Sequence, residues 1–162
     1  MQNERRYDWV VFDSTGTLMQ PHPEAASVYQ AVGRDFGLEL PLESVRSRLK
    51  VAIQNHFFGQ SIDQPTDEGF EDKRWRSIVA ETLPGLSEEI FNDAFLNLWR
   101  RFADVAGWRL FPDVEPLLKR LRERGYRLAV ASNFDRRLRR IADGFHLTDK
   151  LDEILISSEL GF

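Results

Sequence analysis

The sequence predicts an α/β fold in which a parallel sheet forms the core and a helical lobe is inserted after the first strand. A short apolar strand precedes a glycine-containing turn near the N-terminus, and a long stretch with only helical periodicity follows. Strands and helices then alternate to the end of the 162-residue chain. Such alternation is typical of a parallel sheet with right-handed connections. We therefore assign residues 1–20 and 106–162 to the core and residues 21–105 to the inserted lobe.

The first strand is expected at residues 8–12, which contain the apolar run Trp9-Val10-Val11. Polar residues and a glycine follow at once, in the order Asp13-Ser14-Thr15-Gly16-Thr17. A carboxylate at this point stands on a rigid support, with the backbone N–H groups of the turn around it. Two prolines after the turn then mark the exit toward the inserted lobe.

Four helices are expected in the inserted lobe, because apolar residues recur there every three or four positions. The four apolar stripes run over residues 26–36, 45–57, 75–83 and 90–99. Ser87 is placed to cap the fourth helix, whose first turn is acidic. Residues 60–66, which include Pro65, are expected to form a loop. We interpret Trp75, Trp99 and Trp108 as core packing. Phe57 and Phe58 are also interpreted as core, with a substrate pocket as the alternative.

The remaining core elements follow Gly107. A helix is predicted at residues 113–124, closed by Gly125 in the position that favours a left-handed backbone. A strand at 126–131, a helix at 135–145 and a strand at 153–156 complete the alternation. The arginine-rich run within the second of these helices is interpreted as a solvated helix face: Arg136, Arg137, Arg139 and Arg140.

Chemistry-bearing residues follow two of the predicted strands. Asp13, Thr15 and Thr17 come after the first strand, and Ser132 and Asn133 come after the second. The carboxyl ends of parallel strands meet at one edge of the sheet, where the sites of such sheets lie. A carboxylate is a nucleophile in group transfer, and a hydroxyl beside a helix N-terminus binds phosphate. The pattern therefore suits phosphoryl transfer.

The two motifs resemble those of the haloacid dehalogenase superfamily. Its members carry an Asp-x-x-Gly-Thr-Leu turn, which residues 13–18 match, and an apolar strand followed by Ser or Thr, which Ser132 matches. The helical insertion looks like the helical cap that this superfamily places on its Rossmann-like sheet. The string Ser-Asn-Phe-Asp-Arg-Arg-Leu at residues 132–138 is most similar to the subgroup of haloacid dehalogenase-like hydrolase domain-containing protein three. The resemblance covers essentially the whole chain.

The resemblance implies a reaction and a set of site residues. Asp13 would take the phosphoryl group of a small phosphorylated molecule as an acylphosphate, and Ser132 would hold a phosphate oxygen. Asn133 and Thr17 complete the expected substrate-binding set, with a turn-stabilising role for Asn133 as the alternative. The cofactor Mg²⁺ would be bound by the Asp13 carboxylate and the backbone carbonyl of Thr15, where it would shield the repulsion between carboxylate and phosphate.

The sequence departs from the family pattern in two places. Family phosphatases carry a second aspartate two positions after the nucleophile, as general acid and base, and Thr15 stands there in this chain. The family also continues beyond the third strand with a lysine and with a fourth strand that ends in acids, whereas this sequence stops at Phe162. Lys150 precedes the third strand, at the wrong end of the sheet, and Glu159 is more simply a solvated carboxylate.

That second departure has a structural consequence for the first strand. In the family the fourth strand pairs with the first, so the strand before Asp13 is expected to be an exposed edge, which invites pairing with another chain. We expect one of two situations. Either the chain is a piece of a longer enzyme, with the C-terminal part of the core missing, or it forms a homo-oligomer that covers this edge.

Three functions follow from the sequence as alternatives. The first is a phosphatase-like hydrolase that uses Asp13 and Mg²⁺. The second is a catalytically degenerate relative that binds a phosphate or a partner without turnover, which Thr15 and the missing lysine and acids favour. The third, carbon–halogen cleavage by a dehalogenase, usually needs an aromatic residue at the position of Thr15.

Composition narrows the expected partners. The net charge of −4 offers no uniformly positive field, so we expect no nucleic-acid partner. There is no cysteine for a disulfide or a thiolate, and the three histidines lack metal-ligand spacing. Neither a signal peptide nor an apolar run of about eighteen residues is present, which favours a cytoplasmic protein with no membrane partner.

Overall fold

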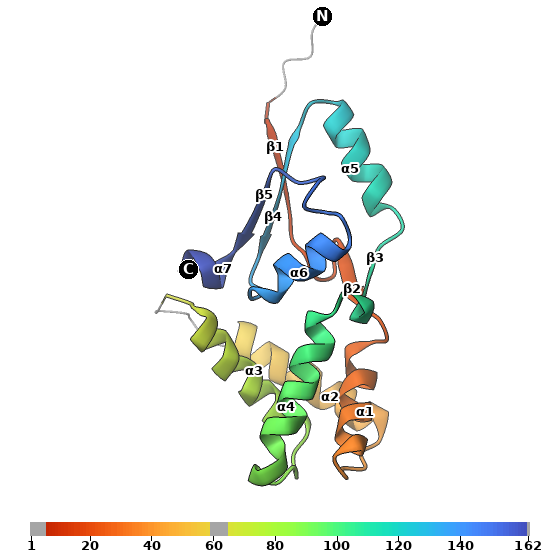
Figure 1. The fold of residues 1–162 in the computed structure, drawn as a ribbon, viewed down its shortest axis with the longest axis vertical. Helices are drawn as coiled ribbons and strands as arrows, with labels where there is room; N and C mark the ends of the chain where they lie inside the picture. The colour runs from red at the N-terminus through yellow and green to blue at the C-terminus, as the bar shows by residue number, and fades with distance from the viewer. Residues whose placement is uncertain (1–5, 59–64, 162) are drawn as a thin grey trace, which may run out of the picture.

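The computed structural model describes residues 6–58 and 65–161, which form two lobes that lie end to end (Figure 1). The sheet lobe holds parallel strands in the order β1 (Trp9–Phe12), β4 (Arg127–Ser132) and β5 (Glu153–Ile156), with α5 (Val114–Glu123), α6 (Arg137–Gly144) and α7 (Ser157–Leu160). The helical lobe holds α1 (Ala25–Asp35), α2 (Leu42–Ile53), α3 (Glu68–Thr82) and α4 (Glu88–Ala103). The predicted α/β fold with a parallel sheet and helices is confirmed.

The parallel sheet buries one of its two faces. Alternate residues of a strand point to opposite faces, and those of the buried face pack with α5 and α6 in the core of the lobe: Val10, Phe12, Leu128, Val130, Ile154 and Ile156. On the other face Val11 is 56% exposed, and Trp9 and Leu155 are exposed as well. Because β4 is the one partner of β1 within the described residues, β1 is an edge strand there, as predicted.

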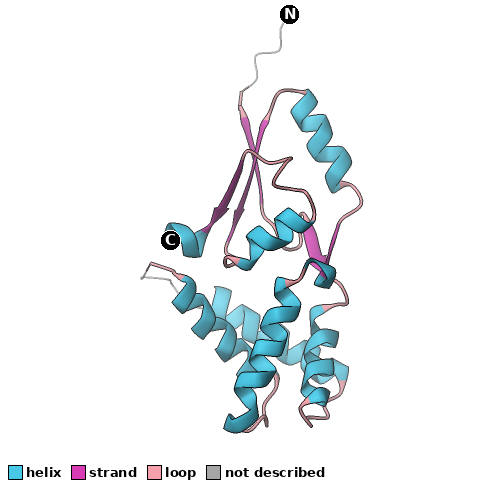
Figure 2. Cartoon of the chain, viewed as in Figure 1, coloured by secondary structure: helices cyan, strands magenta, loops and turns pink. Residues whose placement is uncertain are grey.

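A second, two-stranded sheet joins the lobes, and the sequence analysis missed it. The strands β2 (Met19–Pro21) and β3 (Trp108–Leu110) pair antiparallel where the two lobes meet (Figure 2). The chain enters the helical lobe after β2 and leaves it through the short helix η2 (Val105–Gly107), directly before β3. Strands of three residues are too short for an alternating pattern to stand out in the sequence.

The predicted helices are present, with differences at their ends. The stripe over residues 45–57 does not form one helix, because α2 is followed by a π-helical turn, η1 (Gln54–Phe58). Ser87 is the N-cap residue of α4, but its side chain makes no capping hydrogen bond. Gly125 closes α5 with the predicted left-handed backbone, at φ +79°. Of the predicted loop at 60–66, residues 60–64 lie outside the described residues.

Each lobe has its own hydrophobic core. Leu118, Leu128 and Ile141 are fully buried in the sheet lobe, and the core of the helical lobe is built from all four of its helices. Phe102, near the end of α4, packs against both cores and links them. In the described part of the chain, no helix combines the length and the apolar character that crossing a membrane would need.

Candidate active site

The turns that follow β1 and β4 lie side by side at the carboxyl edge of the sheet. The two strands are parallel neighbours, so their ends reach the same edge. The Ser14 and Ser132 hydroxyls are hydrogen bonded to each other, with 2.7 Å between their oxygens. Asp13 and Asn133, which are adjacent to these serines in sequence, are thereby brought to one place.

The turn after β1 is closed by its own backbone. Gly16 has a φ of +87°, in the left-handed region that favours glycine, and its N–H donates to the Met19 carbonyl oxygen at 2.8 Å. The Met19 N–H donates in turn to the Ser14 carbonyl oxygen at 3.1 Å. The side chains of Asp13 and Thr15 are left exposed on this rigid turn.

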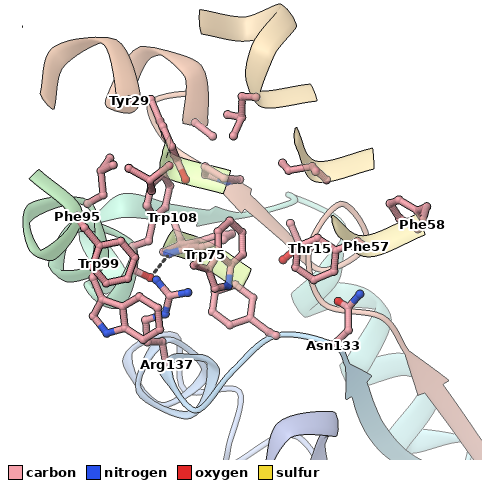
Figure 3. A pocket seen from close by; sticks show the side chains of 18 of the residues that line it. Thr15, Tyr29, Phe57, Phe58, Trp75, Phe95, Trp99, Trp108, Asn133 and Arg137 are labelled. Carbon is pink, nitrogen blue, oxygen red and sulfur yellow. Dashed lines mark hydrogen bonds between the residues drawn. The ribbon is translucent and has the colours of Figure 1, made fainter. Parts of the chain in front are cut away.

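A cavity of about 470 Å³ is lined by these turns and the helical lobe, and this volume suits a small molecule. Asp13, Thr15 and Asn133 line it from the sheet lobe, and the remaining wall comes largely from the helices. In Figure 3, Thr15 and Asn133 lie on one side of the cavity and Tyr29 and Trp99 on the other. The predicted nucleophile therefore opens onto a space that the two lobes build together.

The structure brings three of the five predicted site residues into this cavity. Asp13, Thr15 and Asn133 line it, whereas Ser132 and Thr17 are not part of its wall. The Ser132 hydroxyl accepts a hydrogen bond from the backbone N–H of Phe134 at 3.1 Å, besides its bond to the other serine. Thr17 is exposed on the β1 turn. A role in phosphate binding stays a prediction for both.

About half of the residues that line the cavity are aromatic. This corrects the interpretation of Trp75, Trp99 and Trp108 as core packing alone, and for Phe57 and Phe58 it favours the alternative of a pocket. Nine aromatic residues line the cavity: Tyr29, Phe57, Phe58, Trp75, Phe95, Trp99, Phe102, Trp108 and Phe134. Apart from Trp108 on β3 and Phe134 in the turn after β4, they lie on helices, where their positions follow from the sequence periodicity. Which faces turn toward the sheet lobe depends on how the lobes pack, and no local pattern in the sequence encodes that.

One charged side chain of the wall is buried, contrary to the predicted solvated face. Arg137 is 7% exposed and forms a two-point ion pair with the fully buried Asp135, at 2.7 Å from Nε to Oδ1 and 2.5 Å from Nη2 to Oδ2. The Arg137 guanidinium also stacks on the indole ring of Trp99. The other three arginines of the run are exposed, as predicted.

A second buried ion pair lies in α3 within the electrostatic reach of Arg137. Glu71 Oε1 accepts a hydrogen bond from Arg74 Nη1 at 2.7 Å, and Glu71 is fully buried. Burial raises the pKa of Glu71 to about 7, although Arg74 opposes this shift. Burial also raises the pKa of the Tyr29 hydroxyl in the cavity wall, which therefore stays neutral.

The two further charges weighed in the sequence analysis are engaged elsewhere. Glu159 forms a two-point ion pair with Arg139, at 3.0 Å from Nε to Oε1 and 2.5 Å from Nη2 to Oε2. Lys150 Nζ donates to Glu115 Oε1 at 2.5 Å. Neither Glu159 nor Lys150 lines the cavity.

The donors available to a metal ion are oxygens of the β1 turn. A carboxylate at Asp13 and a carbonyl oxygen at Thr15 are of the kind that Mg²⁺ prefers, and this ion usually keeps several waters and binds substrate phosphate. Over residues 6–58 and 65–161, no three His, Asp or Glu side chains are grouped so that they could hold a metal. The residues present thus fit Mg²⁺ in chemical type and would supply part of its coordination.

Comparison with known proteins identifies the family. The family model of haloacid dehalogenase-like hydrolases matches residues 7–162. The chain belongs to this family. It is 30% identical over 164 residues to human haloacid dehalogenase-like hydrolase domain-containing protein 3, a match that covers 98% of this chain and 63% of the human protein. The predicted resemblance to the superfamily and to this subgroup is confirmed.

Solved structures of haloacid dehalogenase-like hydrolases share the fold. A predicted phosphoglycolate phosphatase from Haemophilus somnus has a TM-score of 0.60 at 18% identity, over 95% of this chain and 64% of that one. The L-2-haloacid dehalogenase of Xanthobacter autotrophicus, solved with chloropropionic acid covalently bound, has a TM-score of 0.57 at 21% identity, over 95% of this chain and 58% of that one. The chain thus spans less than two thirds of the length of the human relative and of both these structures.

Proposed function

We propose that this haloacid dehalogenase-like hydrolase cleaves a small phosphate monoester, with Asp13 as the nucleophile. The observation that carries the proposal is the placement of an exposed carboxylate, on a turn closed by backbone hydrogen bonds, at the wall of a cavity that suits a small molecule. In this proposal the helical lobe is the cap, residues 21–105, and the substrate lies between cap and core.

The reaction proceeds in two displacements at phosphorus. An Asp13 carboxylate oxygen bonds to phosphorus, the bond from phosphorus to the ester oxygen breaks, and the departing alkoxide takes a proton from water. Water then attacks the phosphorus of the Asp13 acylphosphate, which releases inorganic phosphate and restores the carboxylate. The Asn133 amide and the Ser132 hydroxyl donate hydrogen bonds to phosphate oxygens, and Thr17 contributes a hydroxyl from the same turn as Asp13.

The proposed cofactor is Mg²⁺, held by the Asp13 carboxylate and the Thr15 carbonyl oxygen. When bound, it supplies positive charge against the charge of the phosphate. The Thr15 hydroxyl does not ionise near neutral pH, so it cannot replace an aspartate as general acid. General acids contribute about 10²–10⁴-fold, and esters of acidic alcohols, whose leaving groups need no proton, should therefore be turned over best.

Hydrolysis of para-nitrophenyl phosphate in the presence of MgCl₂ tests the proposal. Asp13→Asn keeps the shape of the side chain and removes the nucleophilic charge, and we expect it to lower kcat by at least about 100-fold. Asp8→Asn is the matched control, because Asp8 is also an exposed aspartate but directly precedes β1, whereas Asp13 directly follows it. Full activity of the Asp13→Asn variant would refute Asp13 as the nucleophile. Wild-type protein that binds vanadate without hydrolysing the ester would instead be a binding protein.

A further inference from the structure

We infer that the organic part of the substrate is an uncharged aromatic group, which the aromatic wall of the cavity holds against the helical lobe. This inference rests on the proposed function only for the phosphate end of the molecule. It specifies the chemical class of the organic group that is esterified to the phosphate, which the reaction at Asp13 does not determine.

The first argument is the composition of the wall. Aromatic rings enter it from both lobes, with Tyr29 on α1, Trp75 on α3, Trp99 on α4 and Phe134 beside Asn133. Aliphatic side chains of the helical lobe line the cavity as well: Leu49, Ile53, Val79 and Leu98. A flat ring gains edge and face contacts with such a wall, whereas the hydroxyl groups of a sugar would lose hydration there without enough partners.

The second argument is the distribution of charge. Asp13 stands on the β1 turn, and Arg137 is the other ionic side chain of the wall within the described residues. The Arg137 charge is balanced by the two-point pair with Asp135 and shielded by the face of Trp99. A carboxylate or a second phosphate on the substrate would therefore be desolvated without a free counter-charge.

The third argument comes from Thr15, which faces the same cavity and offers no general acid. An aryl ester releases a phenolate, which is stable enough to leave without a proton. The wall that accepts an aromatic ring and the position that lacks an acid thus point to the same substrates.

Two pairs of phosphate esters test the inference through kcat/KM. 2-Naphthyl phosphate and 4-carboxyphenyl phosphate are both aryl esters but differ in charge. 2-Naphthylmethyl phosphate and glycerol 1-phosphate are both alkyl esters, so their comparison does not depend on a phenolate leaving group. We expect kcat/KM to be at least tenfold higher for the uncharged aromatic ester in each pair. Equal or reversed values of kcat/KM would overturn the inference. Hydrolysis of the esters would in that case still support the proposed function.

A binding measurement separates the inference from catalysis. We expect 2-naphthol to quench tryptophan fluorescence of the wild type and of Asp13→Asn with similar dissociation constants. Ile53→Lys places a cation in the cavity wall and should weaken that binding at least tenfold. Val51→Lys, on the exposed side of the same helix, is the matched control and should leave it unchanged.

The outcomes of the two experiments are distinguishable. Naphthol binding that Ile53→Lys weakens, without hydrolysis of any ester, would refute the proposed function and keep the aromatic site. Absence of naphthol binding, or equal effects of Ile53→Lys and Val51→Lys, would overturn the inference itself.

Discussion

The guanidinium of Arg137 lies against the ring of Trp99, with 3.6 Å between Cζ and the ring centroid, and so joins α6 of the sheet lobe to α4 of the helical lobe. The same Cζ is 5.5 Å from the ring centroid of Trp75 on α3. The Arg137 cation thus contacts two helices of the helical lobe, while Asp135, which belongs to the sheet lobe like Arg137, compensates the charge.

Replacing Arg137 should destabilise the whole chain. Arg137→Met leaves the Asp135 carboxylate buried without its partner, and breaking a buried pair in this way costs about 3–5 kcal/mol. The double variant Asp135→Asn with Arg137→Met removes both charges and should recover much of that loss. Urea unfolding followed by circular dichroism measures the effect, with the exposed Arg140→Met as the control. Equal losses in the Arg137 and Arg140 variants would contradict the prediction.

The buried carboxyl of Glu71 should make stability depend on pH. Its pKa is about 7 in the folded chain against an ordinary value of 4.5, so the folded state holds a proton that the unfolded state releases between these values. The free energy of unfolding therefore falls as pH rises through this window, by at most about 3 kcal/mol. Unfolding curves of Glu71→Gln should lack this fall. If the stabilities of the wild type and of Glu71→Gln change in parallel with pH, burial does not raise the pKa of Glu71.

The pair of serines beside Asp13 offers a matched test of phosphate binding. Ser14→Ala and Ser132→Ala both remove the bond between the two hydroxyls, which should lower stability by about 1 kcal/mol, and Ser132→Ala also removes the bond from the Phe134 N–H. If Ser132 also donates to phosphate, Ser132→Ala alone weakens binding of vanadate, by roughly tenfold or more for a bond to a charged group. Isothermal titration calorimetry measures the vanadate affinity of each variant. Identical affinities of the two variants would show that Ser132 does not bind phosphate.

The exposed edge at β1 predicts self-association of the isolated chain. Val11 is an exposed apolar residue of that edge strand, and such edges pair with other chains unless charged residues protect them. Val11→Lys should raise the monomer fraction in sedimentation velocity over a range of concentrations. Val51→Lys, an exposed valine of α2, should leave the distribution unchanged. A wild-type monomer at every concentration would show that this edge needs no cover.

The elements that could be predicted are those with a clear signal in their own stretch of the sequence. The strand at Glu153–Ile156 has the predicted bounds, because an apolar run defines it, and Gly125 closes α5 as expected. The strands β2 and β3 and the four-residue helix α7 are too short to produce a periodic pattern. Asp13, Thr15 and Asn133 could be grouped in advance because parallel strands end at one edge.

The cavity wall could not be predicted in the same way. Arg137 belongs to a run that looks solvated, and its burial depends on Trp75 and Trp99, which lie far away in the sequence. Only the packing of the lobes brings these residues together. The residues proposed to react follow their strands directly in the sequence, whereas the residues that line the rest of the cavity are brought together only by the tertiary arrangement.

The pairing of β2 with β3 makes the helical lobe an exchangeable module. Met19 lies opposite Leu110, and Pro21 lies opposite Trp108, so the points where the chain departs and returns are neighbours on one ladder. Any segment whose ends meet across two paired strands fits this attachment without altering the order β1-β4-β5. A change of substrate could therefore arise by replacing one continuous stretch of the gene, while Asp13 and the other residues proposed to act on the substrate are inherited unchanged.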